Sequence, residues 1–154
     1  MLKTEEIAKL EIFNGLSPEA IEAIVSFSRE VFYNNKEIIV EESSPNVGLF
    51  VLLEGRVRVE IEKTRYHNDQ KEKVELVVIR SGDIFGEIAF LEDTRSSAYV
   101  TAIDKIRVMQ IDRKKLYELI NKDNHSGYVL MRNLAIILSN RLVNLNFKWR
   151  SEAA

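Results

Sequence analysis

One short stretch of the chain holds the residue types best suited to binding a ligand. In residues 81–100, Gly86 is followed directly by the acid Glu87, and a serine-rich run containing Arg95 closes the stretch. Gly86 permits an unusual backbone conformation, and residues 87–91 can form a helical turn after it. The first N–H groups of such a turn have no partner within the helix and favour an anion. The pattern therefore predicts capture of an oxyanion such as a phosphate.

Glu87 itself has two interpretations. It can be an ordinary acid of a first helical turn, stabilised there by the helix dipole. It can also be a carboxylate that accepts hydrogen bonds from ribose hydroxyls beside a phosphate-binding turn, as acids do in dinucleotide folds. The residue types and their spacing leave both interpretations open.

Catalytic and metal chemistry lack the residues they need. The chain has no cysteine, and its only histidines are His67 and His125. Neither a Ser-His-acid arrangement nor a histidine cluster for a metal can be assembled from them. We therefore expect no catalytic residue, no metal site and no enzyme activity. The absence of cysteine also fits a reducing compartment.

Length and charge restrict the class of protein further. With 154 residues, the chain is expected to form a single domain, 1–154. Its 22 basic and 24 acidic residues disfavour general attraction to nucleic acid, which depends on many phosphate contacts. The acidic start at residues 1–6 is unlike a secretory signal, and no run approaches the roughly twenty apolar residues of a membrane span. We expect a cytoplasmic protein with no direct binding to nucleic acid or membrane.

Three regions must position this stretch: helices in 1–28, strands in 29–112 and helices in 113–150. A short helix is expected over residues 4–13, and Ser17 and Pro18 are typical of the start of a second one ending near Phe27. The polar run 63–73 is expected to be a solvated hairpin loop. Many short strands favour a sandwich, jelly roll or barrel. The strands are expected at residues 30–33, 37–41, 48–54, 56–62, 74–80, 98–102 and 105–111.

The C-terminal region is expected to form two helices. Asp112 can cap the first, over 113–120, and the second should run from Ser126 or Gly127 to about Trp149. One apolar stripe of the long helix comprises Met131, Leu134, Leu138, Leu142, Leu145 and Trp149, and Ile136, Val143 and Phe147 fall on another side. Either the first stripe simply covers the β-domain, or the two faces let the helix touch both the β-domain and a second copy of the chain.

Residues 81–100 closely resemble the phosphate-binding cassette of cyclic-nucleotide-binding domains, the family of bacterial catabolite activator proteins, protein kinase A regulatory subunits and cyclic-nucleotide-gated channels. Residues 12–17 resemble the family's opening motif, and 51–59 its third and fourth strands. The resemblance covers roughly residues 7–145. It implies a mainly β fold with flanking helices: an antiparallel double-stranded β-helix, or jelly-roll-like β-roll, with an N-terminal helical segment, a cassette at 82–100 and C-terminal helices. It also implies a sensor of cAMP or cGMP that needs no further cofactor. We expect this sensor to be a stand-alone domain, with a fragment of a larger protein as the alternative.

The resemblance assigns roles to matching positions. Glu87 would hold the ribose 2′-hydroxyl, backbone N–H groups around Gly86, Ile88 and Ala89 would meet the cyclic phosphate, and the Ser97 hydroxyl would add a bond. Ile88 would report occupancy to the C-terminal helices, which would move when the turn is pulled inward. The expected ligand-binding residues are Gly86, Glu87, Ile88, Ala89, Arg95, Ser96, Ser97 and Ala98.

The cassette departs from the family pattern at one cation. Ligand-binding members usually have an arginine directly before the position of Ser97, whereas this chain has Ser96 there and Arg95 one residue earlier. In extended chain, a displacement by one residue turns a side chain to the opposite face. Either the loop adjusts and Arg95 reaches the phosphate, or that bond is lost at a cost of about 1.5 to 3 kcal/mol, roughly ten- to two-hundredfold in affinity. A cassette that binds no nucleotide would leave a protein-interaction domain as the alternative function.

Overall fold

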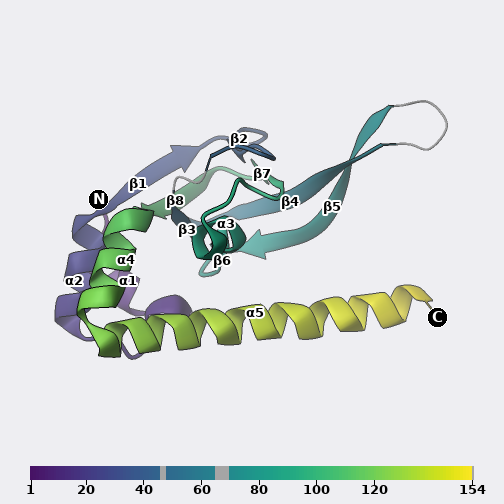
Figure 1. Ribbon diagram of the computed structural model, residues 1–154. Coiled ribbons are helices and arrows are strands. Elements are labelled where there is room, and N and C mark those ends of the chain that lie inside the picture. Colours follow the sequence, from purple (N-terminus) through teal and green to yellow (C-terminus); the bar gives the residue numbers. More distant parts are fainter. Residues whose placement is uncertain (46–47, 65–69, 154) are drawn as a thin grey trace.

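The structure is a computed structural model that describes residues 1–45, 48–64 and 70–153. Within these residues the strands form two four-stranded antiparallel sheets, in the orders β1-β8-β3-β6 and β2-β7-β4-β5 (Figure 1). The strands are β1 (Ser28–Tyr33), β2 (Ile38–Val40), β3 (Leu49–Glu54), β4 (Arg56–Thr64), β5 (Lys71–Arg80), β6 (Ile84–Phe85), β7 (Tyr99–Ala102) and β8 (Ile106–Ile111). This arrangement confirms the expected β-roll.

The first sheet is the middle layer of the molecule, because apolar side chains cover both of its faces. Along β3, Phe50 and Leu52 pack toward the second sheet with Val57 and Val100. The alternate residues Leu49 and Val51 pack in a separate cluster with the helices. This strand is buried on both sides, which explains why its sequence is a continuous apolar run rather than an alternating one.

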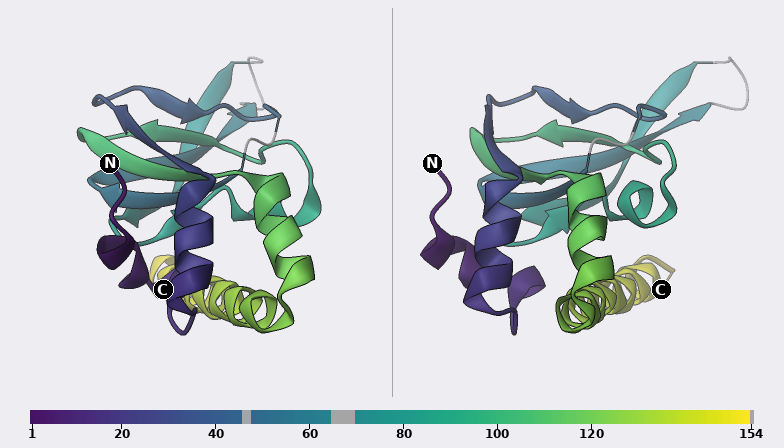
Figure 2. Two further views of the ribbon diagram at one scale, coloured as in Figure 1. Left: turned by 90° about the vertical axis from the view of Figure 1, so that its left-hand side faces the viewer. Right: turned by 60° about the vertical axis from the view of Figure 1, so that its left-hand side comes forward.

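Helices lie against the outer face of the first sheet (Figure 2). They are α1 (Thr4–Ala8), the 3₁₀ turn η1 (Glu11–Phe13), α2 (Pro18–Ser26), α4 (Arg113–Lys122) and α5 (Asn124–Ala153), while α3 (Glu87–Glu92) follows β6. The two expected caps are present: the Ser17 side chain accepts from the Ala20 N–H at 3.1 Å, and that of Asp112 from the Lys115 N–H at 2.9 Å. The single helix expected over 4–13 is instead divided into α1 and η1.

The strands differ from expectation at two places. The short β6 was missed, and it exists because its two residues pair with Phe50 and Val51 of β3, a contact distant in sequence. The polar run 63–73 was expected to be loop throughout, yet β4 and β5 continue into it. Opposite charges face each other there, in the pairs Glu62–Lys73 and Lys63–Glu72, and such cross-strand pairs stabilise a ladder.

The apolar residues of helix α5 that pack on the rest of the described molecule lie in its first half. The buried face includes Leu130, Leu134 and Ile137, four and three residues apart, together with Val129 and Asn133. This face differs from the apolar stripe expected from the sequence. Of that stripe, Leu134 is buried, and Met131 and Leu138 are partly buried. Its last three residues, Leu142, Leu145 and Trp149, are exposed. Figure 1 shows α5 leaving the other helices, passing α3 and continuing beyond it.

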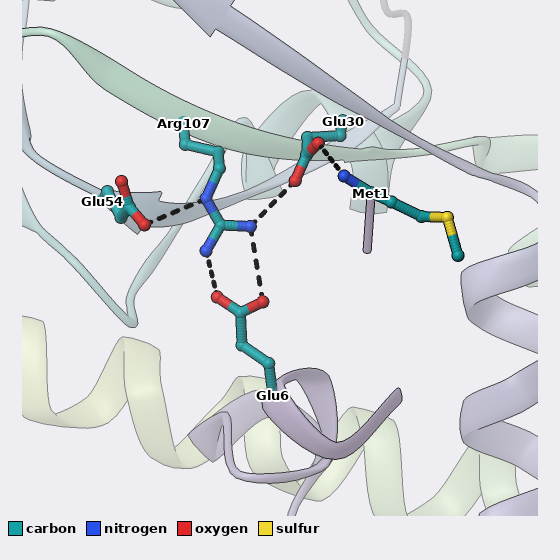
Figure 3. A network of polar contacts seen from close by, with 5 residues as sticks. All are labelled: Met1, Glu6, Glu30, Glu54 and Arg107. Carbon is teal, nitrogen blue, oxygen red and sulfur yellow. Dashed lines mark hydrogen bonds and ion pairs between the residues drawn. The ribbon is translucent and has the colours of Figure 1, made fainter. Parts of the chain in front are cut away.

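An ion-pair network ties the N-terminal segment to three strands (Figure 3). Arg107 of β8 contacts Glu6 of α1, Glu30 of β1 at 2.9 Å and Glu54 of β3 at 3.2 Å. The Met1 amino group also reaches Glu30, at 2.6 Å. The hydrogen bond from Met1, followed by that from Arg107, lowers the pKa of the Glu30 carboxyl.

We expect the variant Glu30→Gln to be less stable than wild type at neutral pH and to approach it in acid. Because the native pKa of Glu30 lies below its ordinary value of 4.5, the ionised carboxylate stabilises the native state above that value. This stabilisation is lost as the pH falls through the native pKa. Urea unfolding at a series of pH values measures the free energy of unfolding of both proteins, and curves that stay parallel into acid would contradict the expectation.

Candidate ligand-binding site

The turn between β6 and α3 requires the glycine at its centre. Gly86 has a φ of +78°, in the left-handed region. A Cβ atom at this position would lie 3.0 Å from Cδ2 of Phe50, whose ring is stacked on Phe85 with centroids 4.8 Å apart. The backbone of the turn therefore rests directly on the core between the sheets.

Gly86→Ala should consequently destabilise the protein more than Gly82→Ala. Both glycines have positive φ, so each alanine incurs about 1 to 2 kcal/mol of backbone strain, but nothing lies within 4 Å of a Cβ at Gly82. Only the alanine at 86 would also press on the Phe50 ring. Urea unfolding of the two variants gives the comparison, and equal losses would show that the contact with Phe50 is unimportant.

Glu87 is held by a residue from the far end of the chain. Its Oε1 lies 3.0 Å from Nη1 of Arg141 on α5, and its side chain is only 14% exposed. The other terminal nitrogen of Arg141, Nη2, lies 3.0 Å from Oδ1 of Asp83 and also donates to the carbonyl of Ile84. One guanidinium thus binds both ends of the turn that contains Gly86.

Arg141 was not among the residues expected from the sequence. It lies four residues after Ile137 and so continues the buried face of Leu130, Leu134 and Ile137. A charged residue at the next position of an apolar helix face is a signal that a sequence can show. Its Nε is buried and has no hydrogen-bond partner among the residues that the structure describes.

The serine-rich part of the cassette is bound to the chain before β3. The Nη1 of Arg95 donates to the Ser43 carbonyl at 2.8 Å, and the Arg95 side chain is exposed. Backbone hydrogen bonds join Ser96 to Ser43 and to Ser44, at 2.8 and 3.0 Å. The Ser96 hydroxyl donates to the Ala98 carbonyl at 2.7 Å. Both Arg95 and Ser96 therefore already have partners within the protein.

The remaining expected site residues are divided between surface and core. Ile88 is 47% exposed on α3, Ala89 and Ala98 are buried, and Ser97 is exposed. The structure thus gathers Gly86, Glu87, Ile88 and Ala89 at the start of α3 and places Arg95 against Ser43. The ligand contacts assigned to all eight residues stay predictions.

Other kinds of site receive little support within the described ranges. His125 is exposed at the start of α5, and His67 lies outside the described residues. Within the described residues, no group of His, Cys, Asp or Glu is arranged to hold a metal ion. No described helix combines the length and apolarity needed to cross a membrane.

The geometry agrees with what comparison with known proteins finds. The family model described as "Cyclic nucleotide-binding domain" matches residues 30–123, more than half of the chain. The chain therefore belongs to the cyclic nucleotide-binding domain family.

Among the relatives, the CRP-like cAMP-activated global transcriptional regulator of Mycobacterium tuberculosis is 27% identical over 146 residues, which are 93% of this chain and 63% of the relative. The cGMP-dependent protein kinase egl-4 of Caenorhabditis elegans is 27% identical over 115 residues, 74% of this chain and 14% of the kinase. The chain thus spans less than two thirds of the length of either relative.

Solved structures agree on the fold. The crystal structure of a cyclic nucleotide-binding protein from Geobacter metallireducens is similar with a TM-score of 0.76 and 25% identity, and the match covers 92% of this chain and 99% of that one. The catabolite activator protein of Thermus thermophilus is similar in fold with a TM-score of 0.70 and 22% identity, over 93% of this chain and 63% of that one.

Proposed function

We propose that this chain is a cytoplasmic sensor domain that binds cAMP or cGMP at the cassette and catalyses no reaction. Membership of the family supports this proposal, as do relatives whose names refer to cAMP or cGMP. The observation that carries it is the ion pair between Glu87 and Arg141. This ion pair holds the Glu87 carboxylate, which is proposed to bind the ribose, in a defined position. It also connects that carboxylate to α5.

The connection suggests how binding would be transmitted. Asp83, Ile84 and Glu87 contact α5 through one side chain, so a ligand that shifts the turn around Gly86 would also shift Arg141. A ligand changes the position of α5 only as far as it binds one arrangement more tightly than another. The output is proposed to be a change in the contacts of α5 with other proteins, without direct binding to nucleic acid.

A second candidate is an interaction domain that binds no nucleotide. The observation in its favour is the serine at position 96, together with the hydrogen bond that holds Arg95 to Ser43. In this arrangement the displaced arginine is already engaged at the surface. The two candidates share the fold and differ in whether a nucleotide binds.

Calorimetry with cAMP and cGMP distinguishes the candidates. We expect wild type to bind at least one of them and Glu87→Gln to bind it roughly ten- to two-hundredfold more weakly, because a hydrogen bond to a charged group contributes about 1.5 to 3 kcal/mol. Glu92→Gln, which changes an exposed acid of the same helix α3, is the matched control and should bind as wild type does.

Two results would contradict this proposal. A wild type that binds neither nucleotide at millimolar concentration would favour the interaction domain, and binding that is insensitive to Glu87→Gln would place the site elsewhere. Arg95→Ala addresses the displaced arginine in the same experiment. A loss as large as that of Glu87→Gln would show that the loop adjusts to bring Arg95 to the phosphate.

We further propose that the second half of α5 pairs with the same segment of a second copy. Its side chains Leu142, Val143, Phe147 and Trp149 are 48 to 73% exposed. At about 100° per residue, Val143 lies on the side of the helix opposite Arg141, and Ile136 and Phe147 share its side. Contiguous exposed apolar side chains of this kind mark protein–protein contact sites.

Sedimentation velocity tests this pairing. Wild type is expected to sediment as a dimer at micromolar concentration, and Val143→Asp should shift it to monomer because a charge would be buried in the interface. Lys148→Asn, an exposed position on another side of the helix, changes the net charge equally and should leave the dimer intact. A monomeric wild type, or equal effects of both substitutions, would contradict pairing through this face.

A further inference from the structure

We infer that the groove between α1 and the turn at residues 81–82 is a docking site for a segment of a partner protein. That segment presents an apolar side chain flanked by acidic residues. The groove has a volume of about 490 Å³, within the roughly 300 to 1,000 Å³ of known ligand pockets, so it has room for a few side chains. The inference goes beyond the proposed function, because it needs no nucleotide and involves neither Glu87 nor α5.

The lining of the groove has an apolar floor and a polar rim. Leu10, which follows α1, and Leu53 of β3 are half-buried and supply the apolar part. The exposed residues of the lining are Lys3, Glu5, Lys9 and Ser81. An apolar centre within a polar, solvated rim is the anatomy of a protein–protein contact, whereas a small-molecule site buries most of its ligand. The groove therefore fits a segment of a protein chain.

Both walls of the groove are fixed to the first sheet. On the side of α1, Ile7 is fully buried and the Glu6 carboxylate contacts Arg107 of β8 (Figure 3). On the other side, the N–H of Gly82 donates to the Leu52 carbonyl at 2.7 Å. A partner that enters the groove does not have to order these walls, and this preorganisation favours binding.

The wall at the turn also leaves space for an incoming side chain. Position 82 is a glycine with a φ of +94°, and a Cβ atom there would meet no described atom within 4 Å. Because glycine has no side chain, a partner can approach the backbone of the turn closely. The neighbouring Ser81 is exposed and brings a hydroxyl to the same edge of the groove.

The charges of the lining favour an acidic partner. The ammonium groups of Lys3 and Lys9 have no ion-pair partner among the residues that the structure describes. The Glu6 carboxylate, in contrast, is paired with Arg107. Glu5 is the remaining charged residue of the lining, so two available cations stand against one acid. Complementary charge of this kind directs the choice of partner more than it adds affinity.

The spacing of the two lysines fits a short extended segment. Lys3 and Lys9 stand at the two ends of α1, about 9 Å of helix rise apart. Extended chain advances about 3.3 Å per residue, so acids two or three positions apart can reach both lysines. A residue between these acids would then contact Leu10 and Leu53.

The first step of the test is selection from a phage library of random short peptides on the wild-type chain. We expect the selected peptides to be enriched in aspartate and glutamate around an apolar residue. The most enriched peptide is then synthesised with a fluorescent label, and fluorescence anisotropy measures its affinity. Raising the salt concentration should weaken binding, because exposed charges are screened.

The second step tests the lysines. The double variant Lys3→Glu/Lys9→Glu should bind the labelled peptide at least roughly tenfold more weakly, because two attractions become repulsions. Lys114→Glu/Lys115→Glu is the matched control. It changes the net charge equally at two exposed residues of α4 outside the groove, and should bind as wild type does.

The third step tests the apolar floor without changing any charge. Ser81→Trp places a large side chain at the edge of the groove and should abolish binding of the peptide by occupying the space above Leu53. Ser139→Trp, at an exposed position of α5, is its control and should bind as wild type does.

Several results would overturn the inference. They are a selection that yields no binder or only peptides without acidic residues, equal affinity of wild type and Lys3→Glu/Lys9→Glu, and displacement of the peptide by cAMP or cGMP. Octanoate, a small apolar carboxylate, probes the alternative occupant by calorimetry. If it binds wild type but not the double variant, and no peptide is selected, the groove belongs to a small ligand. The proposed function survives each of these results, because nucleotide calorimetry tests it separately.

Discussion

The contact of Arg141 with Asp83 and Glu87 is the interaction on which the rest of the proposed site depends. The cassette lies on the β-roll, and the second half of the long helix carries exposed apolar side chains. The Arg141 guanidinium joins the two, beside the apolar cluster that contains Phe90 of α3 and Leu134 of α5. Because it binds on both sides of Gly86, any change in that turn alters the contacts that hold α5. In the proposed function, binding and output would be coupled through the Arg141 side chain.

This coupling is possible because the roll itself is rigid where the turn is attached. β3 is buried on both faces, β6 pairs with it, and Phe50 stacks on Phe85 immediately before Gly86. On the opposite face of the same sheet, Arg107 of β8 forms ion pairs with carboxylates of α1, β1 and β3 and so attaches α1 to the sheet. A well-packed sheet does not deform easily, so movement is expected at its attachments, in α3 and α5.

Local patterns were sufficient to predict most of the fold but little of what holds the site together. Strands such as β4 and helices such as α2 show their structure in alternating apolar residues or in the Ser17–Pro18 start, and these were predicted correctly. The two-residue β6 and the pairing of Ser96 with Ser43 and Ser44 depend on contacts distant in sequence, which no local pattern contains. Glu87 was found from its motif. Arg141, which lies 54 positions later, required knowledge of which face of α5 is buried.

Helix α5 continues past the β-roll with a different arrangement of apolar residues. The face of Leu130, Leu134 and Ile137 changes from apolar to charged at Arg141, where the helix reaches the cassette. Beyond that point the apolar residues continue, but the side chains at 142, 143, 145, 147 and 149 are exposed. Exposed apolar side chains on this part of the helix bury little surface within the domain itself. They are explained if the segment beyond Arg141 is covered by another chain, so that a ligand acting on Arg141 acts at the start of the contact that it regulates.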